Sequence, residues 1–185
     1  PIFIILISVT LIGISSPILY NSLNPYMQQR ILTLFDPGSD PLGTGWNIAQ
    51  SKIAIGSGGF FGKGYLEGTQ SQLDFIPESH SDFIFAVIGE ELGLIGILFL
   101  FSLYALIIYR IFSIGYSSDT VFSRLVCCCI GFIFFIFLII NISMVIGIIP
   151  VVGVPLPLVS QGGTSLVVHL IAFGFVLSMK KRSDW

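Results

Sequence analysis

Charge is scarce in this chain. Only 10% of its 185 residues are Asp, Glu, Lys or Arg, whereas 54% are hydrophobic and the mean hydropathy is +0.95. A soluble domain carries about 25% charged residues. This number of charged residues cannot cover the surface of a globular domain in water. The composition therefore excludes an ordinary soluble domain and indicates that the lipid bilayer is the main solvent.

The chain also lacks the spacings of common metal, redox and nucleotide sites. Its three cysteines are consecutive, at 127–129, and lie in an apolar run. They do not have the C-x-x-C spacing of a metal or redox site and adjacent cysteines rarely bridge, so we interpret them as small apolar residues. The pair Gly62 and Lys63 is no P-loop, because Ser57 stands where that motif needs its first glycine and Gly64 where it needs Ser or Thr.

Long apolar runs are what the chain has instead. Four of them approach or reach the roughly 20 residues that cross a hydrocarbon core, at about 2–20, 83–109, 125–149 and 162–179. The chain enters the first run directly at Pro1, so we expect no signal peptide there. We also expect earlier helices in a longer protein. The predicted fold is one all-α polytopic membrane domain over residues 1–185, with a large loop, 21–82, that contains short helices.

Basic residues predict the orientation of these spans. Five of them fall on one side of a four-span topology: Arg110, Arg124, Lys180, Lys181 and Arg182. By the positive-inside rule this side is cytoplasmic, and it includes the C-terminus. The loop 21–82 and the Pro-rich segment 150–160 then lie on the extracytoplasmic face.

The loop 21–82 has a pattern of its own. Residues 42–55 have helix-like apolar spacing that includes Trp46, Ile48 and Ile53, as in an interfacial or re-entrant helix. A glycine-rich stretch, 56–64, follows and must bend sharply or approach another segment closely. From the residues alone it is either an ordinary glycine turn or a cradle for a phosphate.

Residues 150–165 are rich in proline and then in small polar residues. Three prolines exclude a continued helix, and irregular apolar backbone at membrane depth is tolerated only where it is buried in protein or lines a cavity. The last span starts in a Ser/Gln/Gly/Thr cluster, whose free N–H groups suit an anion. Ser160 and Thr164 are therefore candidates either for the N-cap of that helix or for a binding cavity.

Asp82 stands where the polar loop meets the second span. Glu78 and His80 precede it, and an apolar run begins at Phe83. A carboxylate at the hydrocarbon edge loses part of its hydration and becomes a better proton acceptor, and a membrane-anchored substrate would present its polar head there. The alternative is a capping box, with Ser79 as the N-cap and Asp82 at the third helical position.

Several motifs follow one another from about Arg30 to the end of the chain. They are Asp36-Pro37, Asp40-Pro41-Leu42-Gly43, Gln50 to Gly59, Gly68-Thr69-Gln70-Ser71-Gln72, Phe75-Ile76-Pro77-Glu78, His80 to Phe85, Glu90-Glu91-Leu92-Gly93 and Gly153 to Ser160. This series resembles the SEDS family (shape, elongation, division, sporulation), and its Gly-Ser-Gly-Gly and Gly-Thr-Gln-Ser-Gln stretches resemble the RodA-type members. One position departs from the family pattern, because Gln161 stands where a tyrosine usually follows Leu-Val-Ser.

The resemblance implies a ten-helix fold, of which this chain matches the last four helices and the large loop. It implies a peptidoglycan glycosyltransferase that polymerises lipid II into undecaprenyl-linked glycan strands, for cell-wall elongation and rod shape, in the bacterial cytoplasmic membrane. The implied partner is a class B penicillin-binding protein, and the family's essential loop aspartate falls on Asp82. Neither a nucleic acid nor an organic cofactor is implied, and we expect these 185 residues to be inactive by themselves.

Such a transfer needs a general base and positive charge for a pyrophosphate leaving group. Asp82 is the candidate base. The substrate-binding candidates are Arg30, Lys52, Lys63, Glu78, His80, Ser160 and Thr164, and the first three are the only Lys or Arg residues of the loop. A divalent cation, Mg²⁺ or Mn²⁺, is the other source of positive charge, and the sequence assigns no ligands to it.

Other polar residues lie inside the predicted spans. A charge at that depth is usually paired, so we interpret Glu90 or Glu91 as a polar contact within the bundle rather than as a second catalytic acid. His169 has no counterpart in the family motifs, and we interpret it as structural. Asn141 and Ser143 are expected to form hydrogen bonds between helices.

Two other functions compete with the enzyme. A lipid II flippase also uses polar groups and a broken helix, but it predicts polar residues through the whole membrane depth, and the chain has few. A non-catalytic membrane scaffold for a penicillin-binding protein predicts that Asp82 tolerates substitution.

Overall fold

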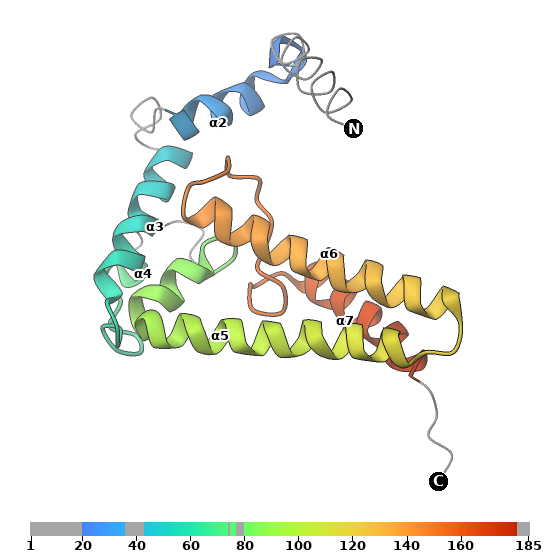
Figure 1. The fold of residues 1–185 in the computed structure, drawn as a ribbon. Helices are drawn as coiled ribbons and strands as arrows, with labels where there is room; N and C mark the ends of the chain where they lie inside the picture. Colours follow the sequence, from blue (N-terminus) through green and yellow to red (C-terminus); the bar gives the residue numbers. More distant parts are fainter. Residues whose placement is uncertain (1–19, 36–42, 74, 77–79, 181–185) are drawn as a thin grey trace, which may run out of the picture.

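The structure is a computed structural model, and it describes residues 20–35, 43–73, 75–76 and 80–180 (Figure 1). These residues form six helices: α2 (Pro25–Phe35), α3 (Thr44–Gly58), α4 (Thr69–Gln72), α5 (Ile84–Ser117), α6 (Val121–Val145) and α7 (Gly163–Ser178). No strand occurs among them. The described part of the chain is therefore all-α, as the sequence predicted.

Two of these helices, α5 and α6, are long and apolar enough to cross a membrane, and α7 is a shorter apolar helix of 16 residues. In Figure 1, α5 and α6 run antiparallel with α7 beside them, while α2 and α3 lie beyond one end of this bundle. The arrangement fits the predicted polytopic membrane fold. The predicted span 2–20 falls almost entirely outside the described residues.

The ends of these helices differ from the predicted spans. α5 continues past Arg110, because an exposed basic side chain does not interrupt the hydrogen bonds of the helix backbone. The helix ends at Ser117, since the next residue, Ser118, has an extended backbone. Thr120 then caps α6 by accepting a hydrogen bond from the N–H of Ser123 at 3.2 Å. The predicted middle loop therefore shrinks to residues 118–120.

Helix α5 is broken near its start, at Gly93 (φ 64°, ψ −160°). In a continuous helix, the N–H groups of Leu94 and Ile95 would bind the carbonyls of Glu90 and Glu91, and the break separates these two pairs. The glycine-rich stretch replaces them with four hydrogen bonds: Lys63 N–H to Glu90 O (3.0 Å), Gly64 N–H to Glu91 O (3.1 Å), Leu94 N–H to Gly59 O (2.9 Å) and Ile95 N–H to Phe60 O (3.2 Å). These four backbone groups are therefore paired, as a site near the hydrocarbon requires.

This contact between two backbones requires glycine. A Cβ on Gly62 would lie 2.0 Å from the carbonyl oxygen of Glu91, and a Cβ on Gly93 would lie 2.3 Å from the Gly62 nitrogen. The expected close approach of residues 56–64 to another segment is confirmed. The alternative of a phosphate cradle is wrong for Lys63 and Gly64, because their N–H groups already bind α5.

Helices α5 and α7 begin at other positions than the capping alternatives above assumed, and Ser79 lies outside the described residues. α5 begins at Ile84 with Phe83 as its N-cap residue, so Asp82 lies before the helix and not at its third position. α7 has Gly162 as its N-cap residue, so neither Ser160 nor Thr164 occupies that position. The hydroxyl of Ser160 has other partners, described below.

Between α6 and α7 the chain passes through irregular backbone that packs into the bundle. Leu156 is 1% exposed, and the hydroxyl of Tyr104 on α5 donates to the carbonyl of Pro157 at 2.5 Å. The sulfur of Met144 accepts from the N–H groups of Val152 and Gly153 at 3.3 and 3.4 Å. The prediction that this apolar, irregular segment is buried in protein is confirmed for Leu156 and Pro157, whereas Val152 and Gly153 are exposed.

Candidate functional site

The turn that carries Asp82 is fixed through three consecutive carbonyl groups. The carbonyl of His80 accepts from the N–H of Gln161 at 3.0 Å, and that of Ser81 accepts from the Ser160 hydroxyl at 2.6 Å. The carbonyl of Asp82 accepts from the side-chain amide of Asn141 at 2.9 Å. Two segments distant in sequence, α6 and the Pro-rich segment, therefore position the backbone at Asp82.

Asn141 links the Asp82 turn to the Pro-rich segment. Its Nδ2 donates to the Asp82 carbonyl and also to the Val154 carbonyl, at 2.7 Å, and the residue has no exposed surface. Because both partners are acceptors, they fix which end of the amide carries the nitrogen. Sequence reasoning predicted a bond between helices, whereas Asn141 joins α6 to two irregular segments. The signal that could have found it was a lone amide in an apolar run.

Ser160 occupies the centre of the contact between the two irregular segments. Its hydroxyl donates to Ser81 O and accepts from the N–H of Leu156 at 2.7 Å, and the residue is buried. Ser160, proposed above as a substrate-binding residue, therefore uses its proton within the protein. The geometry gives it a positioning role for the Asp82 turn.

The carboxylate of Asp82 faces Gly153 in the Pro-rich segment. A Cβ placed on Gly153 would lie only 3.3 Å from Oδ2 of Asp82, and Gly153 has a positive φ of 76°. Glycine is therefore favoured at this position on two grounds, space for the carboxylate and backbone conformation. Asp82 is half-buried, which keeps part of its surface open to a substrate.

The predicted basic residues of the loop have separate environments. Arg30 on α2 donates to the carbonyl of Val151 at 2.5 Å and stacks on the ring of Tyr26, 4.4 Å from its centroid. Arg30 therefore binds the same Pro-rich segment that contacts Asp82. Lys52 is exposed on α3, and a Cβ on Gly147 would lie 2.8 Å from its Nζ, so its ammonium group lies over the start of the segment between α6 and α7.

Lys63 is not directed toward Asp82 but forms an ion pair with Glu90. The Nζ–Oε1 distance is 2.6 Å, and the Glu90 side chain has no exposed surface. Glu90 also accepts hydrogen bonds from the Thr69 hydroxyl and the Gln70 N–H, both at 3.1 Å. Glu90 is a paired polar contact, as predicted, but its partners lie in the loop and not within the bundle. Lys63 and Thr69 hold the loop against α5 through this carboxylate.

The remaining predicted site residues are less informative. Glu78 lies outside the described residues. The side chains of His80 and Thr164 are exposed, and that of Gln161 is also exposed while its N–H binds the His80 carbonyl. The substitution of Gln161 for the usual tyrosine therefore leaves its backbone contact intact.

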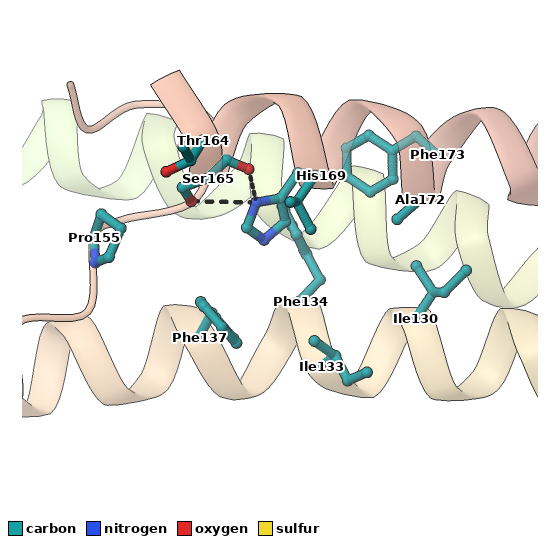
Figure 2. A pocket seen from close by; sticks show the side chains of 11 residues that line it. Ile130, Ile133, Phe134, Phe137, Pro155, Thr164, Ser165, His169, Ala172 and Phe173 are labelled. Carbon is teal, nitrogen blue, oxygen red and sulfur yellow. Dashed lines mark hydrogen bonds between the residues drawn. The ribbon is translucent and has the colours of Figure 1, made fainter. Parts of the chain in front are cut away.

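A groove between α6 and α7, of about 480 Å³, begins at the Pro-rich segment (Figure 2). Figure 2 shows Pro155, Thr164 and Ser165 toward one end and Ile130 and Phe173 toward the other, so the groove becomes more apolar along its length. The prediction that the Pro-rich segment lines a cavity is confirmed for Pro155.

His169 lines the middle of this groove. Its Nδ1 lies 2.7 Å from the Ser165 carbonyl, which can only accept, so Nδ1 carries the proton. The imidazole packs edge-on against Phe134 and Phe137, at 5.6 Å between ring centroids in each case. These contacts fit the structural role expected from the sequence.

A resident metal centre does not fit the residues that the structure describes. They include no group of three or more His, Cys, Asp or Glu side chains that could hold a metal ion. The divalent cation expected from the sequence stays a prediction.

Comparisons with a family model and with curated proteins place the chain in one family. A family model described as "Cell cycle protein" (FtsW/RodA/SpoVE) matches residues 2–184. The chain is 54% identical to "Peptidoglycan glycosyltransferase MrdB" of Escherichia coli (strain K12), over 94% of this chain and 47% of that protein. It is 41% identical to "Peptidoglycan glycosyltransferase RodA" of Treponema pallidum (strain Nichols), over 86% of this chain and 37% of that protein.

A solved structure is also similar. It belongs to a study of "Structural coordination of polymerization and crosslinking by a peptidoglycan synthase complex", with a TM-score of 0.69 and 29% sequence identity, and the match covers 94% of this chain and 47% of the solved one. The chain thus spans about half the length of the MrdB protein and of the solved chain that it matches.

Proposed function

Because the chain belongs to the FtsW/RodA/SpoVE family of cell cycle proteins, we propose that the protein that carries it polymerises lipid II into glycan strands. It would act as a RodA-type peptidoglycan glycosyltransferase in cell-wall elongation. The observation that carries this proposal is the turn at 80–82, in which three consecutive carbonyls are bound and Asp82 is half-buried. An aspartate without a role in a reaction would not need a backbone fixed by three hydrogen bonds from distant segments.

Asp82 is the proposed general base. The acceptor sugar hydroxyl gives its proton to the Asp82 carboxylate and forms a new C–O bond to the anomeric carbon of the donor. The bond from that carbon to the phosphate oxygen breaks, and undecaprenyl pyrophosphate leaves. A positioned base contributes roughly 10²- to 10⁴-fold to such a rate.

The fixed backbone explains how a loop residue can serve as a base. Asn141 and Ser160 bind the carbonyls at Asp82 and Ser81, so the carboxylate starts from a defined position instead of sampling many. Rotational freedom lost before the reaction is not lost again in the transition state. Both residues therefore act on the reaction through Asp82, as positioning residues.

Arg30 and Lys52 are the proposed cations for the pyrophosphate. Arg30 binds the Pro-rich segment, and Lys52 lies over Gly147 and forms no ion pair within the described residues. Lys63 is the weaker candidate, because Glu90 neutralises it. A Mg²⁺ or Mn²⁺ ion is the other proposed source of positive charge, since Mg²⁺ is commonly held by substrate phosphates with one or two protein carboxylates.

A lipid-linked substrate is compatible with the groove between α6 and α7. The groove begins beside Pro155, in the segment that contacts Asp82, and continues along apolar side chains. It offers a hydrocarbon chain a path that starts near the proposed base. We therefore extend the proposal to a substrate whose polar head reacts at Asp82 while its tail lies in the membrane.

The proposed location is the bacterial cytoplasmic membrane, with residues 21–82 outside and the C-terminus inside. The Ser118 hydroxyl donates to the Met179 carbonyl at 3.1 Å, and Arg124 Nε donates to the Ser118 carbonyl at 3.0 Å. These bonds bring the connection between α5 and α6 to the same end of the bundle as Lys180, which supports one basic, cytoplasmic face. The proposed partner is a class B penicillin-binding protein, in keeping with the synthase complex that this chain resembles.

Purified full-length protein in vesicles that contain lipid II distinguishes the three candidate functions. The glycosyltransferase makes long glycan strands that are resolved on a gel. A flippase moves lipid II across the vesicle membrane without forming strands, and a scaffold does neither. Strand formation by protein free of other polymerases is the expected result, and its absence in the presence of the partner and Mg²⁺ would contradict the proposal.

A further inference from the structure

Residues 59–66, here called the aromatic turn, expose an unusual set of apolar side chains. Phe60, Phe61, Tyr65 and Leu66 are 70%, 82%, 76% and 60% exposed. Single exposed apolar residues are ordinary on proteins, but a contiguous group of this kind marks a surface that contacts a partner or a membrane.

The aromatic turn is held in place by its backbone. The four hydrogen bonds across the Gly93 break join it to α5, and Gly62 packs directly on the backbone at Glu91. The ion pair between Lys63 and Glu90 adds a side-chain contact. The turn therefore cannot bury its aromatic side chains by folding back without losing these contacts.

The exposed surface of the turn is continuous with the apolar side of α5. Phe61 lines a shallow groove of about 380 Å³ together with four residues of α5: Leu92, Ile95, Gly96 and Phe99. Phe99 is itself 65% exposed on a helix that is apolar enough to cross a membrane. The lipid that contacts Phe99 would also reach Phe61.

The length of α5 places this groove at the membrane boundary. The part of α5 that follows Gly93 is roughly 36 Å long at 1.5 Å per residue. A hydrocarbon core is about 30 Å thick. With the exposed Arg110 at the cytoplasmic face, the stretch from Leu94 to Arg110 is roughly 26 Å long, so the Gly93 break falls near the other face, where Trp and Tyr are enriched in membrane proteins.

We propose that the aromatic turn is a membrane anchor whose partner is bilayer lipid, with Phe60, Phe61 and Tyr65 inserted at the interface. The anchor fixes the depth of the loop that leads through α4 to Asp82. This inference does not depend on the reaction at Asp82.

Lipid fits this surface better than a protein partner does. The only charged side chain between residues 59 and 66 is Lys63, and its charge is paired with Glu90. A patch that combines exposed aromatic rings with a neutralised charge suits the region between water and hydrocarbon. Coverage by another protein is the competing outcome of the test below.

Photocrosslinking in bacterial membranes tests the proposal. The full-length protein carries p-benzoylphenylalanine at Phe61, at Phe99 as the lipid-facing control, or at Glu67 as an exposed, charged control in the same loop. After irradiation, mass spectrometry detects phospholipid adducts on the labelled peptide. Because these side chains are exposed, the substitutions do not disturb packing.

With the probe at Phe61, we expect a yield of lipid adducts comparable with that at Phe99. With the probe at Glu67, we expect a much lower yield. A yield at Phe61 as low as that at Glu67 overturns the proposal. Crosslinks from Phe61 mainly to another polypeptide also overturn it, because they show that protein covers the turn.

Discussion

The ion pair between Lys63 and Glu90 gives a prediction whose size follows from the structure. Lys63→Met leaves a carboxylate with no exposed surface without its cation. Breaking a buried ion pair in this way costs about 3–5 kcal/mol. The lower end, about 3 kcal/mol, applies here, because 27% of the Lys63 side chain is exposed and two other donors still bind Glu90.

The partner substitutions have smaller effects. Glu90→Met frees a lysine that can turn toward water, so we expect about 1–2 kcal/mol, mostly from the unpaired Gln70 N–H. The double variant Lys63→Met/Glu90→Met removes both charges and should be more stable than Lys63→Met alone by about 1–2 kcal/mol. Lys52→Met, at an exposed lysine without an ion pair in the described residues, serves as the control and should change stability by less than about 0.5 kcal/mol.

The assay is reversible unfolding of the full-length protein in mixed micelles with a rising fraction of denaturing detergent, followed by circular dichroism. The double-mutant cycle isolates the coupling between Lys63 and Glu90. If Lys63→Met is as stable as Lys52→Met, or if the double variant is less stable than Lys63→Met, the pair does not hold the loop on α5.

Three further predictions concern the site and the topology. Asn141→Leu leaves the carbonyls of Asp82 and Val154 without their donor. It should lower kcat for glycan synthesis at least tenfold with little change in KM, because it displaces the base and not the substrate, and a change in KM alone would contradict this. Lys52→Ala should raise the KM for lipid II, whereas Ser57→Ala, exposed on the same helix, should not; equal kinetics would remove Lys52 from the mechanism. In a cysteine-free background, Tyr116→Cys should be labelled only from the cytoplasm and Ser57→Cys only from outside, and reversed labelling would contradict the orientation.

The local sequence pattern is sufficient to predict the long helices and the close approach of the glycine-rich stretch. The apolar runs predict the helices α5, α6 and α7, but not all of their ends. The predicted span 83–109 stops before Arg110, whereas Arg110 is an exposed residue within α5. The glycine-rich stretch predicted a close approach, since only glycine permits backbone contact at Gly62 and Gly93. Sequence did not indicate that α5 itself breaks to receive that stretch.

The partners of single polar residues could not be predicted. Lys63 and Glu90 are 27 positions apart, and Asn141 is 59 positions from Asp82, so no local period links them. A polar residue in an apolar run must find a partner, but its sequence neighbours do not identify that partner. For the same reason Ser160 was assigned to substrate or to a cap, whereas its hydroxyl binds the Asp82 turn.

Asp82→Asn in the full-length protein tests the central claim most directly. Asparagine is nearly the same size as aspartate but does not accept a proton at neutral pH, and the backbone contacts of the turn do not depend on the carboxylate. Membrane insertion and thermal stability should stay near wild type, while the rate of glycan strand formation from purified lipid II falls by roughly 10²-fold or more. Polymerisation at the wild-type rate by a correctly inserted Asp82→Asn variant would contradict the assignment of Asp82 as the base.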